Sequence, residues 1–423
     1  MIKKVEKNTI GLNGTIEIPS DKSISHRAVM FSSLAKGTSI IKNFSKGQDP
    51  NSTLKVFNSL GVQSEFIDEK TLKIHSTGNL IPFNENLDCG NSGTTMRLLS
   101  GILAGQNFDS TLTGDESLSK RPMKRVIDPL ELMGANISSN NYKAPLIIKG
   151  SELFGINYSS KLASAQVKSC VLLAGLYAEG KTTFSEPHIS RNHSELMLKY
   201  MNADIQNDKN ITTINKSTPE ARTIEICGDI SSAAFFIVAG LIVPNSKIIL
   251  KNVGLNPTRT GILEVVEKMG GNIKILDKKI ISGEEVGDIQ ICHSDLKACT
   301  IEGDIIPRLI DELPVIAVLA TQAQGQTIVK DAQDLRNKES DRIKAIVNEL
   351  QKIGADIQES EDGFVINGKK ELKGDAKVET YHDHRLAMSL YIAGLICNKP
   401  IFINEFEWVD VSFPEFKNLF NSL

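Results

Sequence analysis

The first strong helix signal in the sequence is Pro19-Ser20-Asp21-Lys22-Ser23-Ile24-Ser25-His26-Arg27-Ala28, which runs into an apolar stretch that ends at Ala35. Proline and a capping Ser or Asp are typical of the first turn of a helix. Lys22, Ser23 and Arg27 would then lie near a helix N-terminus, where free N–H groups and the helix dipole favour an anion. A capped surface helix with two solvated cations explains this stretch alone equally well.

The same pattern, an apolar helix followed by a polar turn and a β-branched strand, occurs six times along the chain. The apolar helices are expected at 28–35, 96–104, 167–176, 233–243, 315–320 and 386–396. Amphipathic helices with one apolar face alternate with them, and a sixth, shorter one is expected at 414–423. The first five end in Gly61, Gly134, Asn202, Gly270 and Gly354, residues that suit a left-handed helix C-cap.

Six units with two helices and at least two strands each are longer than the repeats of about 20–50 residues that build solenoids. We therefore expect an α+β (α/β) fold with two similar domains, each of three pseudo-symmetric helix-and-sheet repeats. The natural division lies between the third and fourth copies. It predicts an N-terminal lobe at 20–227 and a C-terminal lobe of 1–19 plus 228–423, with hinges near 19–20 and 227–228.

The composition narrows the class of function. The 423 residues carry a net charge of −3 and only 5% aromatic residues, which argues against nucleic-acid binding and against attraction to an anionic membrane. The six cysteines contain no C-x-x-C pair, so neither zinc nor a disulfide framework is expected. No signal peptide is apparent, and the longest apolar run stops at Pro244, too short for a membrane span. We expect a cytoplasmic monomer that acts on small molecules.

Polar residues gather where the apolar helices begin. These helix openings carry Lys22, Ser23 and Arg27, then 90–95, 164–166, 229–232, 311–312 and 382–385. Three more charged strings lie between copies, at 120–125, 190–193 and 336–342. Each has an ordinary interpretation as a turn, cap or solvated loop, and His382-x-His384 alone is a weak metal signal. Their recurrence at equivalent places in the repeat favours a shared anion-binding role, because Arg grips carboxylate or phosphate through two parallel bonds.

Five of these motifs together resemble the signatures of the 5-enolpyruvylshikimate-3-phosphate (EPSP) synthase family. They are Asp21-Lys22-Ser23-Ile24-Ser25-His26-Arg27-Ala28, Gly90-Asn91-Ser92-Gly93-Thr94-Thr95-Met96-Arg97-Leu98, Lys120-Arg121-Pro122-Met123, Lys338-Glu339-Ser340-Asp341-Arg342 and Asp383-His384-Arg385-Leu386-Ala387. The resemblance extends from residue 19 to residue 414. It implies an inside-out α/β barrel of the enolpyruvyl transferase type, with three repeats in each domain and a two-stranded hinge.

The resemblance also implies an activity. The enolpyruvyl group of phosphoenolpyruvate would pass to the 5-hydroxyl of 3-phosphoshikimate, with release of phosphate, a step toward chorismate and the aromatic amino acids. No metal or organic cofactor is implied. Gly93 beside phosphoenolpyruvate would leave room for the inhibitor glyphosate.

The resemblance assigns roles residue by residue. Lys22 would contact both substrates, Asp311 would accept the proton of the 5-hydroxyl, and Glu339 would transfer a proton at the methylene carbon. The residues that would bind 3-phosphoshikimate are Lys22, Ser23, Arg27, Ser164, Gln166, Asp311 and Lys338. Those that would bind phosphoenolpyruvate are Lys22, Gly93, Arg121, Gln166, Arg342 and Arg385. Ser190 and Arg191 are further candidates for contacts to the shikimate moiety.

The charges agree with this assignment. Each substrate carries a phosphate of about −1.5 to −2 and a carboxylate, so two mutually repelling anions must be held together. Six of the assigned residues are cations. Ala165, His193 and Val411 differ from residues common in other members of the family, and these differences put secondary contacts in doubt.

Three alternatives remain at this point. A sister enzyme transfers enolpyruvyl to UDP-N-acetylglucosamine, but it has Lys-Asn where Lys22-Ser23 stands and usually a Cys or Asp in a mobile loop, here 114–119. An RNA 3′-phosphate cyclase-like protein would need a nucleotide-handling histidine and a basic face. A two-domain anion-binding protein without activity leaves Asp311 and Glu339 without a role.

Overall fold

The computed structural model describes residues 1–423 and contains six small sheets, each associated with a pair of helices. The chain divides into two compact units. The amino-terminal unit consists of residues 20–226 with 280–284, and the carboxy-terminal unit consists of 1–19, 227–279 and 285–423. This division differs from the predicted lobes in two places: Cys227 belongs to the carboxy-terminal unit, and the turn at 280–284 belongs to the amino-terminal one.

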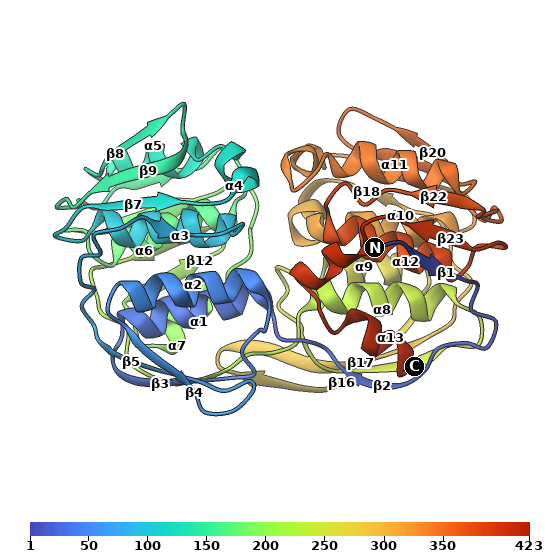
Figure 1. Ribbon diagram of the computed structural model, residues 1–423, viewed down its shortest axis with the longest axis horizontal. Helices are drawn as coiled ribbons and strands as arrows, with labels where there is room; N and C mark the ends of the chain where they lie inside the picture. The colour runs from blue at the N-terminus through green and yellow to red at the C-terminus, as the bar shows by residue number, and fades with distance from the viewer. The chain divides into compact units, whose positions relative to one another are not determined.

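The amino-terminal unit contains three helix-and-sheet repeats (Figure 1). Its helices are α1 (Lys22–Leu34), α2 (Gln48–Ser59), α3 (Gly93–Ala104), α4 (Glu116–Lys120), α5 (Lys124–Leu132), α6 (Ala165–Gly175) and α7 (His193–Tyr200). Its strands are β3 (Lys36–Lys42), β4 (Gln63–Phe66), β5 (Leu72–Thr77), β6 (Leu87–Asp88), β7 (Ser110–Thr113), β8 (Asn136–Asn140), β9 (Lys143–Lys149), β10 (Asn157–Ser159), β11 (Thr182–Ser185), β12 (Ile205–Asp208), β13 (Ile211–Ile214) and β14 (Thr223–Glu225).

The carboxy-terminal unit repeats the scheme. Its α-helices are α8 (Ile230–Ile242), α9 (Gly261–Lys268), α10 (Leu313–Thr321), α11 (Arg342–Lys352), α12 (His384–Gly394) and α13 (Phe416–Asn421). Its strands are β1 (Lys3–Val5), β2 (Asn13–Glu17), β15 (Lys247–Gly254), β16 (Asn272–Ile281), β17 (Glu284–Cys292), β18 (Thr300–Ile301), β19 (Gln326–Val329), β20 (Asp356–Glu359), β21 (Phe364–Asn367), β22 (Ala376–Val378) and β23 (Ile401–Ile403). Four 3₁₀ turns complete it: η1 (Gly303–Arg308), η2 (Ile310–Glu312), η3 (Gln333–Asn337) and η4 (Phe406–Val411).

Each four-stranded sheet has the same order. One strand lies parallel to the strand that follows the buried helix, and an antiparallel hairpin continues on the other side, as in β14-β3-β5-β4 and β18-β19-β21-β20. Because β2 pairs in parallel with β15 and β1 pairs antiparallel with β23, the first residues of the chain complete two sheets of the carboxy-terminal unit. The sixth sheet has only three strands, β1-β23-β22.

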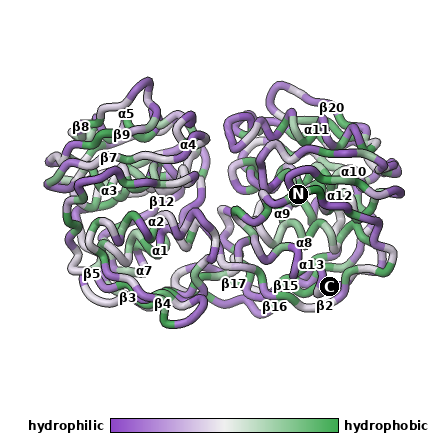
Figure 2. Tube along the Cα trace, in the orientation of Figure 1, coloured by the Kyte–Doolittle hydropathy of each residue, from purple (hydrophilic) through white to green (hydrophobic).

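One helix of each repeat, such as α3 or α8, is enclosed inside its unit, whereas amphipathic helices such as α5 and α9 keep one exposed face. Nearly every residue of α3 and α8 is buried, whereas strands such as β5 alternate buried and exposed residues. Figure 2 shows hydrophobic segments along these helices and hydrophilic ones in the outer loops. A helix that is apolar all round must be enclosed, and a strand with period two covers a core on one face. This arrangement confirms the predicted fold class.

The helix boundaries follow local chemistry. Five buried helices are capped at their N-termini by a side-chain oxygen that accepts a hydrogen bond from a backbone N–H. The capping residues are Asp21 of α1, Ser92 of α3, Ser164 of α6, Asp229 of α8 and Asp383 of α12. The amphipathic helices end where predicted, since Gly61, Gly134, Asn202, Gly270 and Gly354 all have positive φ angles between 58° and 98°. The left-handed backbone conformation costs glycine and asparagine less free energy than other residues. These five residues therefore end the helices.

Candidate active site

The N-terminus of α1 holds the first group of predicted residues. Asp21 accepts a hydrogen bond from the Ile24 N–H (2.8 Å), which places Lys22 and Ser23 in the first turn. Arg27, one turn later, is 3% exposed and donates to the Ser23 carbonyl (2.9 Å). It also donates from Nε to Ser194 and from Nη2 to Ser169 (2.8 and 2.9 Å). Its guanidinium is therefore fixed in position before any ligand binds.

Lys22 has an acidic partner that the sequence did not reveal. Its ammonium lies 3.2 Å from a carboxylate oxygen of Asp49, in the first turn of α2. Both side chains keep some contact with solvent, with exposed fractions of 27% and 18%. The ammonium is thus oriented by Asp49 and still accessible to an anion.

A buried chain of polar side chains joins the openings of three helices. His26 Nδ1 lies 2.6 Å from Thr53 Oγ1, which lies 2.7 Å from Thr95 Oγ1, and Thr95 donates to Ser92 Oγ (2.7 Å). These residues belong to α1, α2, α3 and the cap of α3. Burial, the largest cause, lowers the pKa of His26 to about 3, so this histidine is neutral at physiological pH.

The structure brings Gly93 together with two guanidinium groups at the start of α3. A Cβ atom built on Gly93 would lie 2.8 Å from Arg97 Nη1 and 3.4 Å from Arg121 Nη1. Arg121 also donates from Nη2 to Asn91 Oδ1 (2.9 Å). The absence of a side chain at Gly93 therefore lets two guanidinium groups approach the start of α3 closely, an arrangement suited to an anion.

Gln166 belongs to the same group. Its Oε1 accepts from Arg97 Nη1 (2.8 Å), and its Nε2 donates to Thr94 Oγ1 (3.1 Å). Ser164, predicted beside it, accepts from the Val167 N–H as the cap of α6. Arg97 was quoted in a motif but received no predicted role. Arg97 follows Gly93 by four residues, about one helical turn, so the sequence could have indicated that both lie on the same face of the helix.

In the carboxy-terminal unit, Arg342 is the centre of a second group. Its side chain is 1% exposed and lies within 3.3 Å of Asp311 Oδ1, 2.6 Å of Glu339 Oε2 and 2.7 Å of Asp383 Oδ2. Lys338 Nζ lies 3.7 Å from Asp311 Oδ1. The two predicted carboxylates and two predicted cations thus form one cluster, although they come from η2, the segment after η3 and α11.

Arg342 keeps its charge in this setting. Burial alone would lower its pKa, but the surrounding carboxylates, Asp383 foremost, outweigh burial and hold that pKa above its ordinary value. Arg385, in the first turn of α12, donates from Nη1 to the Asp311 carbonyl (3.1 Å). Asp383 both accepts from Arg342 and caps α12, so it fixes the helix that carries Arg385.

The charge around the predicted residues differs between the units. The amino-terminal group has four cations, Lys22, Arg27, Arg97 and Arg121, with Asp49 and Asp115 nearby. The carboxy-terminal group has Lys338, Arg342 and Arg385 together with four carboxylates, those of Asp311, Glu312, Glu339 and Asp383. The six cations counted from the sequence are thus not six free counter-charges. The surplus of positive charge lies in the amino-terminal unit.

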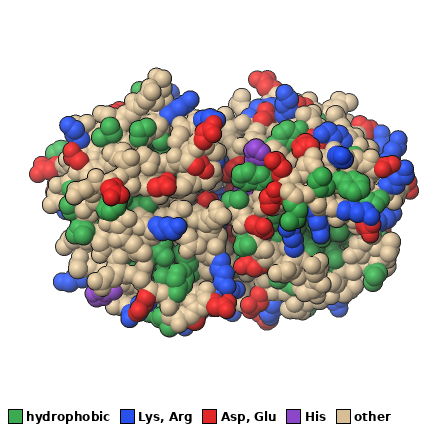
Figure 3. Space-filling model, in the orientation of Figure 1, with side chains coloured by type: hydrophobic (Ala, Val, Ile, Leu, Met, Phe, Trp, Pro, Cys, Tyr) green, Lys and Arg blue, Asp and Glu red, His purple; other side chains and the backbone are tan.

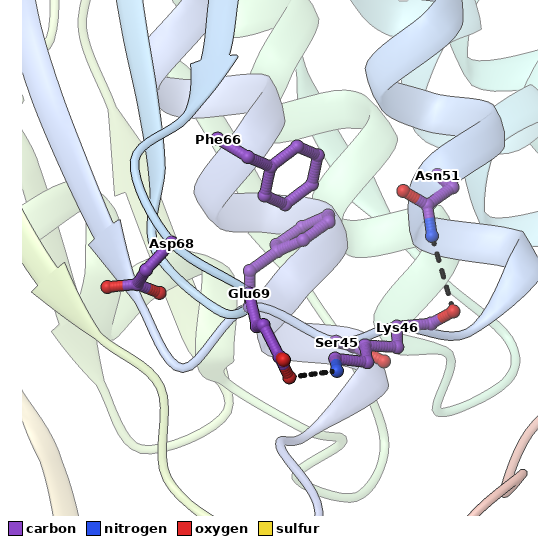
Figure 4. Close-up of a pocket in the computed structure, with 7 residues that line it drawn as sticks. Ser45, Lys46, Asn51, Phe66, Asp68 and Glu69 are labelled. Atoms are coloured by element: carbon purple, nitrogen blue, oxygen red, sulfur yellow. Dashed lines mark hydrogen bonds and ion pairs between the residues drawn. The ribbon is translucent and has the colours of Figure 1, made fainter.

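Other features lie outside these groups. A pocket of about 340 Å³ is lined by Phe44, Ser45, Lys46, Asn51, Phe66, Asp68 and Glu69, and contains no predicted residue. Figure 4 shows the Lys46–Glu69 ion pair at its edge. No group of three or more His, Cys, Asp or Glu side chains is arranged to hold a metal, and His382 stacks on Trp408 instead. Each helix is either too short or too polar to span a lipid bilayer.

Of the three residues that depart from the family pattern, His193 has a buried acidic partner. His193, in the first turn of α7, lies 2.7 Å from Glu284 Oε1, and both side chains are buried. Ala165 is the first residue of α6, and Val411 ends η4. The His193 side chain therefore holds Glu284, just after the turn that follows β16, and is not exposed to solvent.

Two units of helix-and-sheet repeats, with guanidinium, ammonium and hydroxyl groups where several buried helices begin, define a class of protein suited to anionic small molecules. The chain matches the family EPSP synthase (3-phosphoshikimate 1-carboxyvinyltransferase) over residues 7–420. The 3-phosphoshikimate 1-carboxyvinyltransferase of Petrotoga mobilis is 49% identical over 98% of both chains. Those of Thermodesulfovibrio yellowstonii and Bacillus pumilus are 51% and 52% identical, over 100% and 96% of each chain.

Solved structures agree. The structure of the EPSP synthase from Acinetobacter baumannii matches with a TM-score of 0.91 and 40% identity, over 100% of this chain and 98% of the other. The enolpyruvyl transferase NikO from Streptomyces tendae shares the fold, with a TM-score of 0.79 at 14% identity over 100% and 97% of the two chains. The chain belongs to the EPSP synthase family.

Proposed function

We propose that this enzyme transfers the enolpyruvyl group of phosphoenolpyruvate to the 5-hydroxyl of 3-phosphoshikimate, giving 5-enolpyruvylshikimate 3-phosphate and phosphate. The observation that carries the proposal is the full-length similarity, at 49–52% identity, to proteins named for this reaction. The clustering of the motif residues within each unit supports it.

The amino-terminal unit would hold most of 3-phosphoshikimate. Ser23, Arg27, Ser164 and Gln166 offer hydroxyl, guanidinium and amide donors at the openings of α1 and α6. Arg27 is already held by Ser169 and Ser194, so little side-chain entropy is lost when an anion binds. Lys338 and Asp311 would add contacts to the same substrate.

Phosphoenolpyruvate would be held by Arg121, Gly93 and Gln166 of the amino-terminal unit and by Arg342 and Arg385 of the carboxy-terminal unit. Lys22 would contact both substrates. Planar guanidinium groups suit the carboxylate and the phosphate of this substrate because they form paired, parallel hydrogen bonds.

Addition and elimination together need three proton transfers: one from the 5-hydroxyl, one to C3 and one from C3. Asp311 would take the proton of the 5-hydroxyl while that oxygen attacks C2 of phosphoenolpyruvate, and Glu339 would act in proton transfer at the methylene carbon C3. The tetrahedral adduct would then lose a proton from C3 and expel phosphate with the electron pair of the C2–O bond. Arg342 touches both carboxylates, at 3.3 and 2.6 Å, and would keep them oriented.

We further infer a monomer that works in the cytoplasm. None of the six cysteines forms a disulfide, and four of them are buried, as is usual for proteins of a reducing compartment. Positively and negatively charged side chains are mixed over the face drawn in Figure 3, which favours solubility over non-specific association.

Phosphate release from phosphoenolpyruvate, measured with the purified protein, tests the proposal. Release that requires 3-phosphoshikimate is the expected result. Release that requires UDP-N-acetylglucosamine would instead identify the sister activity, and binding of both substrates without release would identify an anion-binding protein. The segment 114–119, where the sister enzyme usually has Cys or Asp, has Asp115 as the cap of α4, engaged with the Leu118 N–H (2.8 Å).

A further inference from the structure

A second buried polar network lies directly behind the predicted residues of the carboxy-terminal unit. Arg259 lies just before α9, and its Nη2 donates to Ser231 Oγ (2.7 Å) and to Asp229 Oδ1 (3.2 Å) at the start of α8. Ser231 Oγ in turn donates to Glu312 Oε1 through a short hydrogen bond. These side chains contain two carboxylates and one guanidinium, and the proposed reaction uses none of them.

The network ends at two residues that the proposed reaction does use. Glu312 follows Asp311 in the turn η2. Its Oε1 lies 4.0 Å from Nη1 of Arg385, and the same Nη1 donates to the Asp311 carbonyl at 3.1 Å. The Glu312 side chain and the Asp311 carbonyl are therefore the two acceptors that face Arg385 from η2.

Burying the charged groups of this network costs free energy, so the network contributes little to stability. The side chains of Glu312 and Arg259 are 0% and 2% exposed, and Glu312 Oε2 has no hydrogen-bond partner. A buried ion pair is often no more stabilising than apolar residues of the same volume, because desolvation offsets the attraction between the charges. A role in positioning explains such an arrangement better than stability does.

The opening of α8 also differs from the opening of α1. At α1, Lys22 and Arg27 provide cations for an anion from solution. At α8, a carboxylate of the chain itself, Glu312, accepts from a hydroxyl in the first turn of the helix, where free N–H groups and the dipole favour negative charge. The α8 opening thus anchors η2 instead of binding a substrate.

We propose that Glu312, Ser231 and Arg259 are positioning residues that hold η2 so that Asp311 faces Arg342 and Arg385 keeps the orientation needed for phosphoenolpyruvate. This inference rests on the proposed function. Loosening the anchor would misplace Asp311, which lowers kcat, and would free Arg385, which weakens phosphoenolpyruvate binding. The contacts to 3-phosphoshikimate from α1 and α6 would be unaffected.

Two variants of the full chain test the inference. Ser231→Ala removes the hydroxyl that joins Arg259 to Glu312, and Glu312→Gln keeps the shape and an acceptor for Ser231 but removes the charge. We expect each to lower kcat about tenfold and to raise KM for phosphoenolpyruvate about tenfold, the size of losing one hydrogen bond to a charged group. KM for 3-phosphoshikimate should rise by about threefold at most, because Asp311 is only one of the seven proposed contacts to that substrate.

Matched controls separate positioning from stability. Ser33→Ala removes a buried hydroxyl that donates only to the Val29 carbonyl of its own helix α1. Glu349→Gln alters a carboxylate whose side chain, like that of Glu312, is 0% exposed, and whose partners are Lys352, Tyr381 and the Glu379 N–H. Both controls should lower the unfolding temperature and leave kcat and both KM values within about twofold.

The outcomes are distinct. If Ser231→Ala and Glu312→Gln leave both KM for phosphoenolpyruvate and kcat at the level of their controls, the positioning role is wrong. An equal rise in both KM values would also contradict it, because that result indicates general loosening of the protein. If Glu312→Gln does not fold, Ser231→Ala decides by the same criteria. An inactive wild-type enzyme would refute the proposed function instead.

Discussion

Single residues determine which charged groups meet in this enzyme. The lack of a side chain at Gly93 lets Arg97 and Arg121 approach the start of α3, and Arg342 is held by three carboxylates in a buried position. Sequence motifs singled out Gly93, Arg121 and Arg342 as candidates because each stands in a short pattern, and their roles in binding stay predictions. Arg97 and the Lys22–Asp49 pair were missed, since a pattern along the chain does not show which side chains meet in space.

At this scale we predict the effect of a single methyl group. Gly93→Ala would place a Cβ 2.8 Å from Arg97 Nη1, the flexible end of a side chain that can shift, so the protein should fold. Alanine also favours a helix over glycine by up to about 1 kcal/mol. Because the methyl group narrows the anion space, glyphosate inhibition should weaken more than substrate turnover, as measured by inhibition constants and KM for phosphoenolpyruvate.

Gly101→Ala in the same helix is the contrasting variant. Its Cβ would lie 2.2 Å from the Cys170 carbonyl oxygen, a backbone atom that cannot move aside. We expect a lower unfolding temperature and no specific change in inhibition. Unchanged inhibition of Gly93→Ala would contradict the placement of Gly93 beside phosphoenolpyruvate.

At the scale of helices and strands, local chemistry made prediction possible. The apolar helices, their caps and their left-handed ends depend on residues within one or two turns, and all six apolar helices lie where the sequence indicated. The connections between helices depend on residues far apart in the chain and were not predicted. The chain from His26 through Thr53 to Thr95 is one example, and the anchor of η2 by Ser231 is another.

The helix connection through His26 predicts a pH dependence of stability. Burial lowers the pKa of His26 to about 3, whereas an unfolded histidine titrates near about 6.5. The unfolded state therefore binds the proton first, and stability falls as pH drops below about 6.5 toward 3. Between pH 7 and pH 5 the loss from this group should be about 2 kcal/mol.

Urea unfolding of wild type and His26→Asn at both pH values measures this contribution. Asn can still pair with Thr53 but cannot take up a proton, so the variant should lose about 2 kcal/mol less than wild type. His75→Asn is the control, since His75 is exposed and also lies near a threonine hydroxyl, Thr38 Oγ1 at 3.0 Å. Equal losses in wild type and His26→Asn would show that His26 is not buried as a neutral group.

At the scale of the whole molecule, six repeats form two units with the same plan. The number of repeats and the fold class could be predicted because each repeat contains the same recognisable pattern, an apolar helix followed by a β-branched strand. The assignment of residues 280–284 was not predicted, because no signal in the sequence indicates that the turn of a long hairpin belongs with the other unit. The proposed contacts to each substrate come from both units.

Because the proposed contacts to each substrate come from both units, substrate binding is predicted to change the radius of gyration of the protein. If both units must hold the substrates, then 3-phosphoshikimate together with glyphosate should reduce the radius of gyration measured by small-angle X-ray scattering. UDP-N-acetylglucosamine, which the proposed site does not recognise, is the matched ligand control and should leave it unchanged. Identical dimensions with and without 3-phosphoshikimate and glyphosate would contradict closure of the two units on the substrates.

The most direct test of the proposed chemistry follows one oxygen atom. Phosphoenolpyruvate labelled with ¹⁸O between C2 and phosphorus is incubated with 3-phosphoshikimate and the enzyme, and the phosphate is analysed by mass. Addition at C2 and elimination break the C2–O bond, so the account predicts that the label leaves in inorganic phosphate. Label that remains on the three-carbon product would mean that the P–O bond breaks, and enolpyruvyl transfer would be contradicted.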